Sequence, residues 1–321
     1  MSRSEAFRMA RAREPGADVG DDGLDPRSRL RPVSRPPWMS IAHRNEAPPI
    51  QAPTLSPSEA PPHPPAWGRT DRGRVRPGNE DCCFVAALDR TVDANADAPP
   101  GLLLVVADGV GGRPGGEIAS ALAVDAMTCY VQTVVPWVLT AGEPDRERLD
   151  AWLHDALRRT QVRLRRFALR RGLDPRLATT FTMACMTWPD LVIAHVGDSR
   201  CYLARDGAIE RLTVDHTLAQ RLCEDGQLAP EELERSPYSH MLLNALGGST
   251  DELSVDIHRT QLRPGDALLL CTDGLNRHVS DDELAEHLAA ARPVDATVDG
   301  LIDLANERGG SDNVTVVLAR P

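Results

Sequence analysis

The chain has 321 residues and a formal net charge of −11, an acidic balance that argues against nucleic acid as a partner. No apolar run approaches the roughly 18 residues that a membrane helix needs, and the N-terminus lacks the apolar core of a signal peptide. Seven cysteines without a Cys-x-x-Cys pair indicate neither a disulfide framework nor a zinc site. We therefore expect a cytoplasmic protein without membrane or nucleic-acid partners.

The composition changes near residue 66. Thirteen of the 26 prolines lie within residues 1–66, with almost no periodic apolar pattern around them. This composition is typical of a disordered extension that the chemistry does not need. Residues 67–321 carry repeated apolar runs and are long enough to form one well-buried core. We expect a disordered proline-rich extension over 1–66 and one folded domain over 67–321.

Seven short apolar runs, bounded by Gly, Asp or Pro, predict β-strands. They are 81–88, 102–107, 180–187, 191–196, 200–205, 267–272 and 314–318. Apolar residues at three-and-four spacing predict helices. The predicted helices cover 118–129, 149–168, the segment after a capping box at 280–283, and 298–305. Because strands and helices come in blocks, we infer an α+β fold with mostly antiparallel sheet.

Acidic residues recur at the ends of these predicted strands. In chain order they are Glu80, Asp81, Asp108, Asp198, Asp273 and Asp312. A single aspartate at such a place is ordinarily a turn residue. Their repetition indicates that the fold brings several carboxylates together.

Carboxylates brought together repel one another unless cations neutralise them. All-oxygen ligands suit Mg²⁺ or Mn²⁺ better than zinc. Gly109 follows Asp108 and has no side chain, so its carbonyl can also turn toward an ion. Two such ions can share one water, lower its pKa and hold it for in-line attack. The pattern therefore indicates hydrolysis by a dinuclear-metal-activated water.

Arg76 lies four residues before Glu80. A guanidinium near metal-binding carboxylates can hold two phosphate oxygens in a fork geometry. A surface arginine in a Pro-Gly turn is the alternative, and we would prefer it if Arg76 stood alone. Beside the acidic residues, Arg76 is expected to bind the substrate phosphate.

Eight motifs occur in the order and approximate spacing of a known family. They are RPGNED, VVADGVGG, TTFTMACM, AHVGDSRCYL, TVDHT, NALGG, LLLCTDGL and SDNVTVV. On these motifs, residues 68–318 resemble the bacterial form of the PP2C-type (PPM family) metal-dependent protein serine/threonine phosphatases. The resemblance implies a four-layer α-β-β-α sandwich of two antiparallel β-sheets flanked by helices.

The resemblance also implies a set of metal ligands. Asp108 would bridge two Mn²⁺ or Mg²⁺ ions, with the Gly109 carbonyl on the first of them. Asp273 and Asp312 would hold the second ion.

The remaining acidic residues have lesser roles by the same resemblance. Glu80 and Asp81 would act mostly through waters, and Asp198 would contribute to a third, weaker ion. The residues expected to carry catalysis are Asp108, Asp273 and Arg76.

One position departs from the animal members of this family. A His follows their Asp-Gly pair and is proposed as the general acid, whereas this chain has Val110 there. The group that protonates the leaving serine or threonine oxygen is therefore open, with a metal-bound water as the first candidate. We interpret His195 and His216 as structural, and we expect Arg200 to orient Asp198 or the chain around it.

Residues 215–244 are polar and contain Pro230 and Pro237. By the resemblance they correspond to a flap beside the cleft, which we name the flap here. We expect the flap to influence substrate access.

The predicted function is a protein serine/threonine phosphatase. One alternative is a non-catalytic regulatory module with the same fold, which a loss of metal ligands would favour. Another is a phosphatase of an anti-sigma-factor antagonist, which shares the chemistry and differs in substrate. The expected partners are phosphorylated Ser/Thr proteins, including a cognate kinase and its substrates, and the chain is expected to be a monomer.

Overall fold

The computed structural model describes residues 66–88, 101–110, 115–140 and 146–320. The extension expected over 1–66 lies outside these residues, apart from Ala66, which begins the first strand. Among the described residues, no helix has the length and apolarity needed to cross a membrane. The seven cysteines are all free.

One sheet has five strands, all paired antiparallel. In spatial order its strands are β1 (Ala66–Asp71), β12 (Val314–Ala319), β11 (Ala267–Cys271), β7 (Arg200–Arg205) and β8 (Ala208–Arg211). Strands β12 and β11 are buried throughout and rich in Val and Leu, as expected of strands covered on both faces, and β7 is buried over its first four residues.

The second sheet has seven strands and is also antiparallel. Its main path is β10 (Asp256–Gln261), β6 (Asp190–Val196), β5 (Phe181–Thr187) and β3 (Gly101–Val110), with β2 (Asp81–Leu88) on the far side of β3. Two short strands, β4 (Ala178–Thr179) and β9 (Leu246–Gly247), extend the end of β3.

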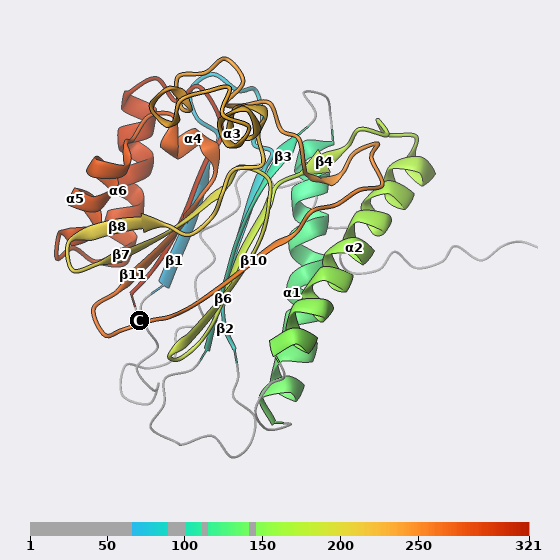
Figure 1. Ribbon diagram of the computed structural model, residues 1–321, viewed down its shortest axis with the longest axis horizontal. Coiled ribbons are helices and arrows are strands. Elements are labelled where there is room, and N and C mark those ends of the chain that lie inside the picture. The colour runs from blue at the N-terminus through green and yellow to red at the C-terminus, as the bar shows by residue number, and fades with distance from the viewer. Residues whose placement is uncertain (1–65, 89–100, 111–114, 141–145, 321) are drawn as a thin grey trace, which may run out of the picture. The chain divides into compact units, whose positions relative to one another are not determined.

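Helices cover the outer face of each sheet (Figure 1). The long helices α1 (Gly116–Thr140) and α2 (Arg146–Arg171) pack on the seven-stranded sheet. The helices α5 (Asp281–Ala289) and α6 (Val294–Glu307) pack on the five-stranded sheet. Two short helices, α3 (Leu218–Glu224) and α4 (Asp273–Asn276), lie at one end of the sandwich, at the top of Figure 1.

Three apolar cores hold these four layers together. One lies between α1, α2 and the seven-stranded sheet, and contains Leu103, Met127 and Leu157. A second lies between the five-stranded sheet and α5 and α6. The third lies between the two sheets, where Leu104 of β3 and Leu268 of β11 are fully buried. The predicted four-layer α-β-β-α sandwich is confirmed.

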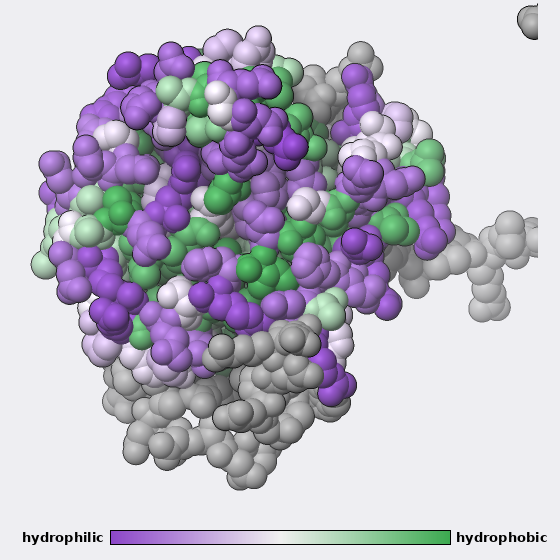
Figure 2. Space-filling model, viewed as in Figure 1, coloured by the Kyte–Doolittle hydropathy of each residue, from purple (hydrophilic) through white to green (hydrophobic). Residues whose placement is uncertain are grey.

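The face of the protein in Figure 2 is mainly hydrophilic, as expected when the apolar side chains lie between the layers. Hydrophilic residues dominate the face shown in Figure 2, and hydrophobic residues appear there singly or in small groups. Exposed apolar side chains include three in the flap, namely Tyr238, Met241 and Leu243.

All seven predicted strands and four predicted helices are present, and the strands at 81–88 and 200–205 have the predicted bounds. The strands β1, β8 and β10 were not predicted from the sequence, and their residues are mostly half-buried or exposed. The two-residue strands β4 and β9 and the short helices α3 and α4 were not predicted either. These elements lack the apolar run or the long period on which the predictions were based.

Candidate active site

One end of the sandwich collects the acidic residues singled out in the sequence. Because neighbouring strands are antiparallel, the start of one strand lies beside the end of the next. The register places Asp81 at the start of β2 opposite Asp108 near the end of β3. Asp273 follows β11, Asp312 precedes its neighbour β12, and Asp198 lies between β6 and β7. Arg277 contacts both Asp273 and Asp312, and Asp198 and Asp273 line one pocket. Burial, followed by repulsion from the other four carboxylates, raises the pKa of Asp108.

Asp81 links the two sheets at this end. Its Oδ2 accepts hydrogen bonds from the hydroxyls of Thr272 at 2.8 Å and Thr315 at 2.6 Å. Its Oδ1 is buried and has no hydrogen-bond partner among the described residues. Burial raises the pKa of the Asp81 carboxyl to about 7, although the two hydroxyl bonds favour the charged form. A buried carboxylate oxygen without a donor is costly unless a cation approaches it.

Asp108 is fixed through its backbone. Its N–H donates to the Thr180 hydroxyl at 2.8 Å. Its carbonyl accepts from the Thr180 N–H at 2.8 Å and from the Thr179 hydroxyl at 2.8 Å. These bonds hold the end of β3 in place, and desolvation together with repulsion from Asp81 raises the pKa of Asp108 well above its usual range. A positive charge nearby would therefore stabilise the ionised carboxylate of Asp108.

Gly109 has no room for a side chain. An added Cβ would lie 2.2 Å from the Gly116 carbonyl oxygen and 2.7 Å from that of Glu80. The Gly109 N–H and the Ser120 hydroxyl both donate to the Glu80 carbonyl, at 3.1 and 2.6 Å. Burial, followed by repulsion from Glu117, raises the pKa of the Glu80 side chain. Close backbone packing thus requires glycine here, and the role of its carbonyl toward an ion stays a prediction.

Two arginines contact the remaining carboxylates. Asp273 begins α4, and Arg277, one helical turn later, binds its Oδ2. The Arg76 Nη2 donates to Asp312 Oδ2 at 2.7 Å, and the Arg277 Nη1 lies 3.4 Å from the same oxygen. The other oxygen of Asp273, Oδ1, is buried without a partner among the described residues. Arg76 thus lies beside the acidic residues, as predicted.

The loop that carries Arg76 is fixed by Asn313. The Asn313 side-chain amide donates to the carbonyls of Arg72 at 2.9 Å and Gly78 at 2.8 Å. Its Oδ1 accepts from the Glu80 N–H at 2.8 Å. One buried side chain therefore sets both ends of the segment that presents Arg76.

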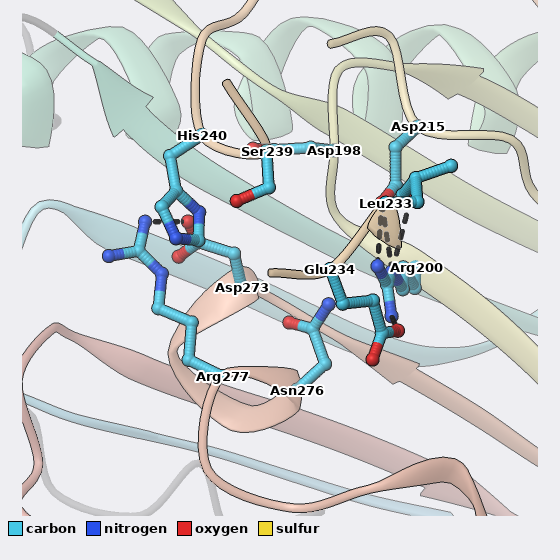
Figure 3. A pocket seen from close by; sticks show the side chains of 10 residues that line it. All are labelled: Asp198, Arg200, Asp215, Leu233, Glu234, Ser239, His240, Asp273, Asn276 and Arg277. Atoms are coloured by element: carbon cyan, nitrogen blue, oxygen red, sulfur yellow. Dashed lines mark hydrogen bonds and ion pairs between the residues drawn. The ribbon is translucent and has the colours of Figure 1, made fainter. Parts of the chain in front are cut away.

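A pocket opens beside Asp273 and is bounded on one side by the flap (Figure 3). Its lining residues are Asp198, Arg200, Asp215, Leu233, Glu234, Ser239, His240, Asp273, Asn276 and Arg277. Asp198 is 6% exposed, and burial followed by repulsion from Asp273 raises its pKa well above the usual range. The pocket therefore adjoins the acidic residues on the side of Asp198.

Arg200 connects the core to the flap. Its Nη2 and Nε donate to Asp215 at 2.7 and 3.1 Å, and its Nη1 donates to Glu234 of the flap at 3.2 Å. The Nη1 also lies 3.1 Å from the Tyr202 hydroxyl. We expected Arg200 to orient Asp198 or the chain around it, whereas its side-chain hydrogen bonds go to Asp215, Glu234 and Tyr202.

The two histidines interpreted as structural occupy structural positions. His195 is buried, with Nδ1 2.8 Å from the Thr182 hydroxyl and Nε2 3.0 Å from the Val214 carbonyl. Burial lowers the pKa of His195 to about 4, so it is neutral at pH 7. His216 accepts at Nδ1 from the Gly197 N–H at 3.1 Å, which fixes a loop next to the site.

The residues at this end fit divalent cations in their chemistry. They offer oxygen donors, they repel one another, and Asp81 and Asp273 each have a buried oxygen without a donor. Within the described part of the chain, no three His, Cys, Asp or Glu side chains already converge on a single point. The arginines Arg76 and Arg277 contact the carboxylates there.

Several site residues were missed in the sequence. Thr272, Thr315 and Asn313 belong to no pattern that sequence spacing alone reveals, since their partners lie far away in the chain. Arg277 carried a signal that could have been used. It follows Asp273 by four residues, the spacing at which two helical side chains meet.

The two antiparallel sheets, their flanking helices and the acidic end define a class of protein, the metal-dependent phosphohydrolases. A family model described as "Protein phosphatase 2C" matches residues 91–318. The chain therefore belongs to the protein phosphatase 2C family, and it is a metal-dependent protein serine/threonine phosphatase. The resemblance inferred from the eight motifs is confirmed.

Individual relatives agree. The chain is 34% identical over 250 residues to the serine/threonine phosphatase stp of Listeria monocytogenes, covering 78% of this chain and 93% of that protein. The structure of Stp1 from Staphylococcus aureus has a TM-score of 0.69 at 28% identity, covering 85% and 99% of the two chains. The catalytic domain of PstP in complex with two manganese ions has a TM-score of 0.63 at 34% identity, covering 79% and 96%.

Proposed function

We propose that the acidic end of the sandwich binds two divalent cations and hydrolyses phosphoserine and phosphothreonine. The observation that carries this proposal is that Asp81 and Asp273 each keep a buried oxygen without a donor among mutually repelling carboxylates. The proposed metal ligands are Asp108, Gly109 through its carbonyl, Asp273, Asp312, Asp81 and Glu80. When bound, divalent cations neutralise phosphate charge and make a water nucleophilic at neutral pH.

The residues of the chain divide the remaining work. Arg76 binds the substrate phosphate, because its guanidinium is already held next to the ligand carboxylate of Asp312. Asn313 and the threonines around Asp81 hold these groups in position. Because these hydrogen bonds already fix the side chains of the site, less conformational entropy is lost when substrate binds.

The proton for the leaving oxygen does not come from a histidine after the Asp-Gly pair, since that position is Val110. His240 of the flap lines the pocket beside Asp273 (Figure 3). Burial, followed by the charge of Arg277, lowers the pKa of His240, so its imidazole is neutral at pH 7. A neutral imidazole is a poor general acid, which leaves a water at the site as the proposed proton donor.

The choice of ions and partners extends the proposal. The manganese in the PstP structure supports Mn²⁺, and the same oxygen ligands accept Mg²⁺. The resemblance implies that Asp198 contributes to a third, weaker ion. Whether it does so depends on which positive charge neutralises its carboxylate. We propose phosphoproteins as substrates, a cognate Ser/Thr kinase among them, for a monomer in the cytoplasm.

Two alternatives remain distinct from this proposal. A non-catalytic module is disfavoured because Asp108, Asp273 and Asp312 are all present. A phosphatase of an anti-sigma-factor antagonist would use the same site on a different phosphoprotein.

Phosphate release from a phosphothreonine peptide tests the proposal. We expect activity with Mn²⁺ or Mg²⁺, none with EDTA, and recovery when metal is added back. Folded protein that remains inactive with both metals would contradict the catalytic function and favour the non-catalytic module.

The flap is proposed to control access to the site. Glu234, Ser239 and His240 of the flap line the pocket next to Asp273. Replacing residues 218–241 with a short Gly-Ser linker should change turnover of phosphopeptides more than turnover of a small aryl phosphate. Equal changes for both substrates would contradict a role in access.

Residues 67–321 are proposed to carry the activity without the proline-rich extension. Deletion of residues 1–66 should leave hydrolysis of a small phosphate ester near the wild-type level. Loss of this hydrolysis in a folded deletion variant would contradict the proposed domain division.

A further inference from the structure

Arg277 lies among the acidic residues but has no role in the function proposed above. Its guanidinium binds Asp273 Oδ2, and its Nη1 lies 3.4 Å from Asp312 Oδ2. The Arg277 side chain is 25% exposed, so most of it is removed from water. An arginine keeps its charge in such a place. Arg277 therefore brings a permanent positive charge into the acidic end.

This charge also acts on Asp198. Asp198, Asp273 and Arg277 line the same pocket, and Arg277 and Asp273 lie in contact in Figure 3. Because Asp198 and Asp273 line the same pocket, a cation held there by Asp198 would also lie near Asp273 and the Arg277 guanidinium.

The two oxygens of Asp273 have different surroundings. Oδ2 is bound by Arg277, whereas Oδ1 is buried without a partner among the described residues. One oxygen is thus available to a metal ion while the other stays on the guanidinium. A further ion between Asp273 and Asp198 would meet the guanidinium at close range, and two cations at such a distance repel strongly in a partly buried site.

We propose that Arg277 is the fixed cation of this site and takes the place of a third metal ion beside Asp198. The chain then binds two divalent ions, and its third positive charge is built into the sequence. This inference rests on the two-metal function proposed above. It revises the expectation, drawn from the resemblance, that Asp198 contributes to a third ion.

The number of Mn²⁺ ions bound per chain tests the inference directly. The metal-free full-length protein is titrated with Mn²⁺ by equilibrium dialysis, up to millimolar free metal. We expect two ions in the wild type. Arg277→Ala should bind a third, with a dissociation constant on the order of 1 mM, whereas Arg277→Lys keeps the charge and should stay at two.

Two further variants locate the third ion. The double variant Asp198→Asn/Arg277→Ala should return to two ions, because it lacks the Asp198 carboxylate that would hold the third ion. Arg205→Ala removes an arginine that pairs with Asp266, at the other end of the β7–β11 strand pair, and should also bind two. Circular dichroism and thermal unfolding confirm that each variant is folded.

The outcomes separate the two levels of the proposal. Three ions in the wild type, or two in folded Arg277→Ala, would overturn the role of Arg277. If no Arg277 variant folds, the number of Mn²⁺ ions bound by the wild type and by Asp198→Asn decides the matter. Two ions in both proteins would support the role of Arg277. A wild type that binds no Mn²⁺ and hydrolyses no phosphopeptide would instead overturn the two-metal function.

Discussion

The strands β7 and β11 are neighbours, and each end of this pair lies next to a buried aspartate. At one end Asp266, 2% exposed, accepts hydrogen bonds from Arg205 Nε at 2.9 Å and Nη2 at 2.7 Å, and from the Arg263 N–H at 2.7 Å. At the other end Asp273, 7% exposed, leaves Oδ1 without a partner among the described residues. Burial alone therefore does not distinguish the two carboxylates, whereas the missing donor at Asp273 does.

The two ends also differ in how they hold charge. Burial would raise the pKa of Asp266, but its bonds from Arg205 and Arg263 outweigh burial and lower it. At the acidic end, burial prevails, and the pKa of Asp108 is raised well above its usual range. At the paired end, Asp266 is therefore stabilised as a carboxylate by its own partners, whereas the carboxylates of the acidic end would be stabilised by added cations.

Substitution of one aspartate at each end should separate activity from stability. Asp273→Asn should lower kcat/KM by about a thousandfold or more, because a proposed metal ligand is lost. Asp266→Asn should leave kcat/KM near the wild-type value and lower the free energy of unfolding by about 2 kcal/mol, because it breaks a buried pair. Phosphopeptide kinetics and urea unfolding measure the two effects, and similar losses of activity in both variants would contradict the contrast.

Two arginines allow the same comparison at a smaller scale. Arg76→Ala should lower kcat/KM by about a hundredfold, since a charge-assisted contact to the transferred phosphate is lost. Arg205→Ala is the matched control, because it also removes an arginine from an aspartate but at the paired end. Its kcat/KM should change little. A small effect of Arg76→Ala would remove Arg76 from the phosphate site.

Metal-free protein should show opposite pH dependence at the two ends. Asp81 binds its proton more tightly in the folded chain, with a pKa of about 7 against an ordinary 3.8. Its protonation stabilises the fold below about pH 4, and this stabilisation is lost as pH rises through about 7. In EDTA at pH 8, Asp81→Asn should therefore be more stable than the wild type by about 1 kcal/mol or more.

The control for this prediction is Asp266→Asn, whose wild-type carboxyl has a lowered pKa. It should be less stable than the wild type at pH 7, and the difference should shrink as pH falls below about 4. Urea unfolding over this pH range measures both variants. The same pH trend in the two would contradict the assignment of charge to the two ends.

The sequence predicted the buried strands well because their apolar runs end abruptly at Asp, Gly or Pro. The predicted strand at 81–88 matches β2 in both bounds. The strand β10 alternates exposed and half-buried residues at a sheet edge, so the run DIHRTQ carries no apolar signal. Helix α4 has only four residues, too few for any helical period.

At the site, residue type could be predicted but partners could not. Carboxylates after apolar runs are visible in the sequence, and the antiparallel sheets brought all of them to one end. The contact of Asp81 with Thr315 spans 234 residues, and that of Glu80 with Asn313 spans 233. Such contacts depend on how the two sheets stack, which no local pattern specifies.

The hydrogen bonds of Asp81 to Thr272 and Thr315 have a consequence for synthesis of the chain. They join Asp81 to residues that are synthesised 191 and 234 positions later. A nascent chain that still lacks β12 has no Thr315 and no Asp312, and so no complete acidic end. We therefore expect the acidic end to form only after β12 has joined its sheet.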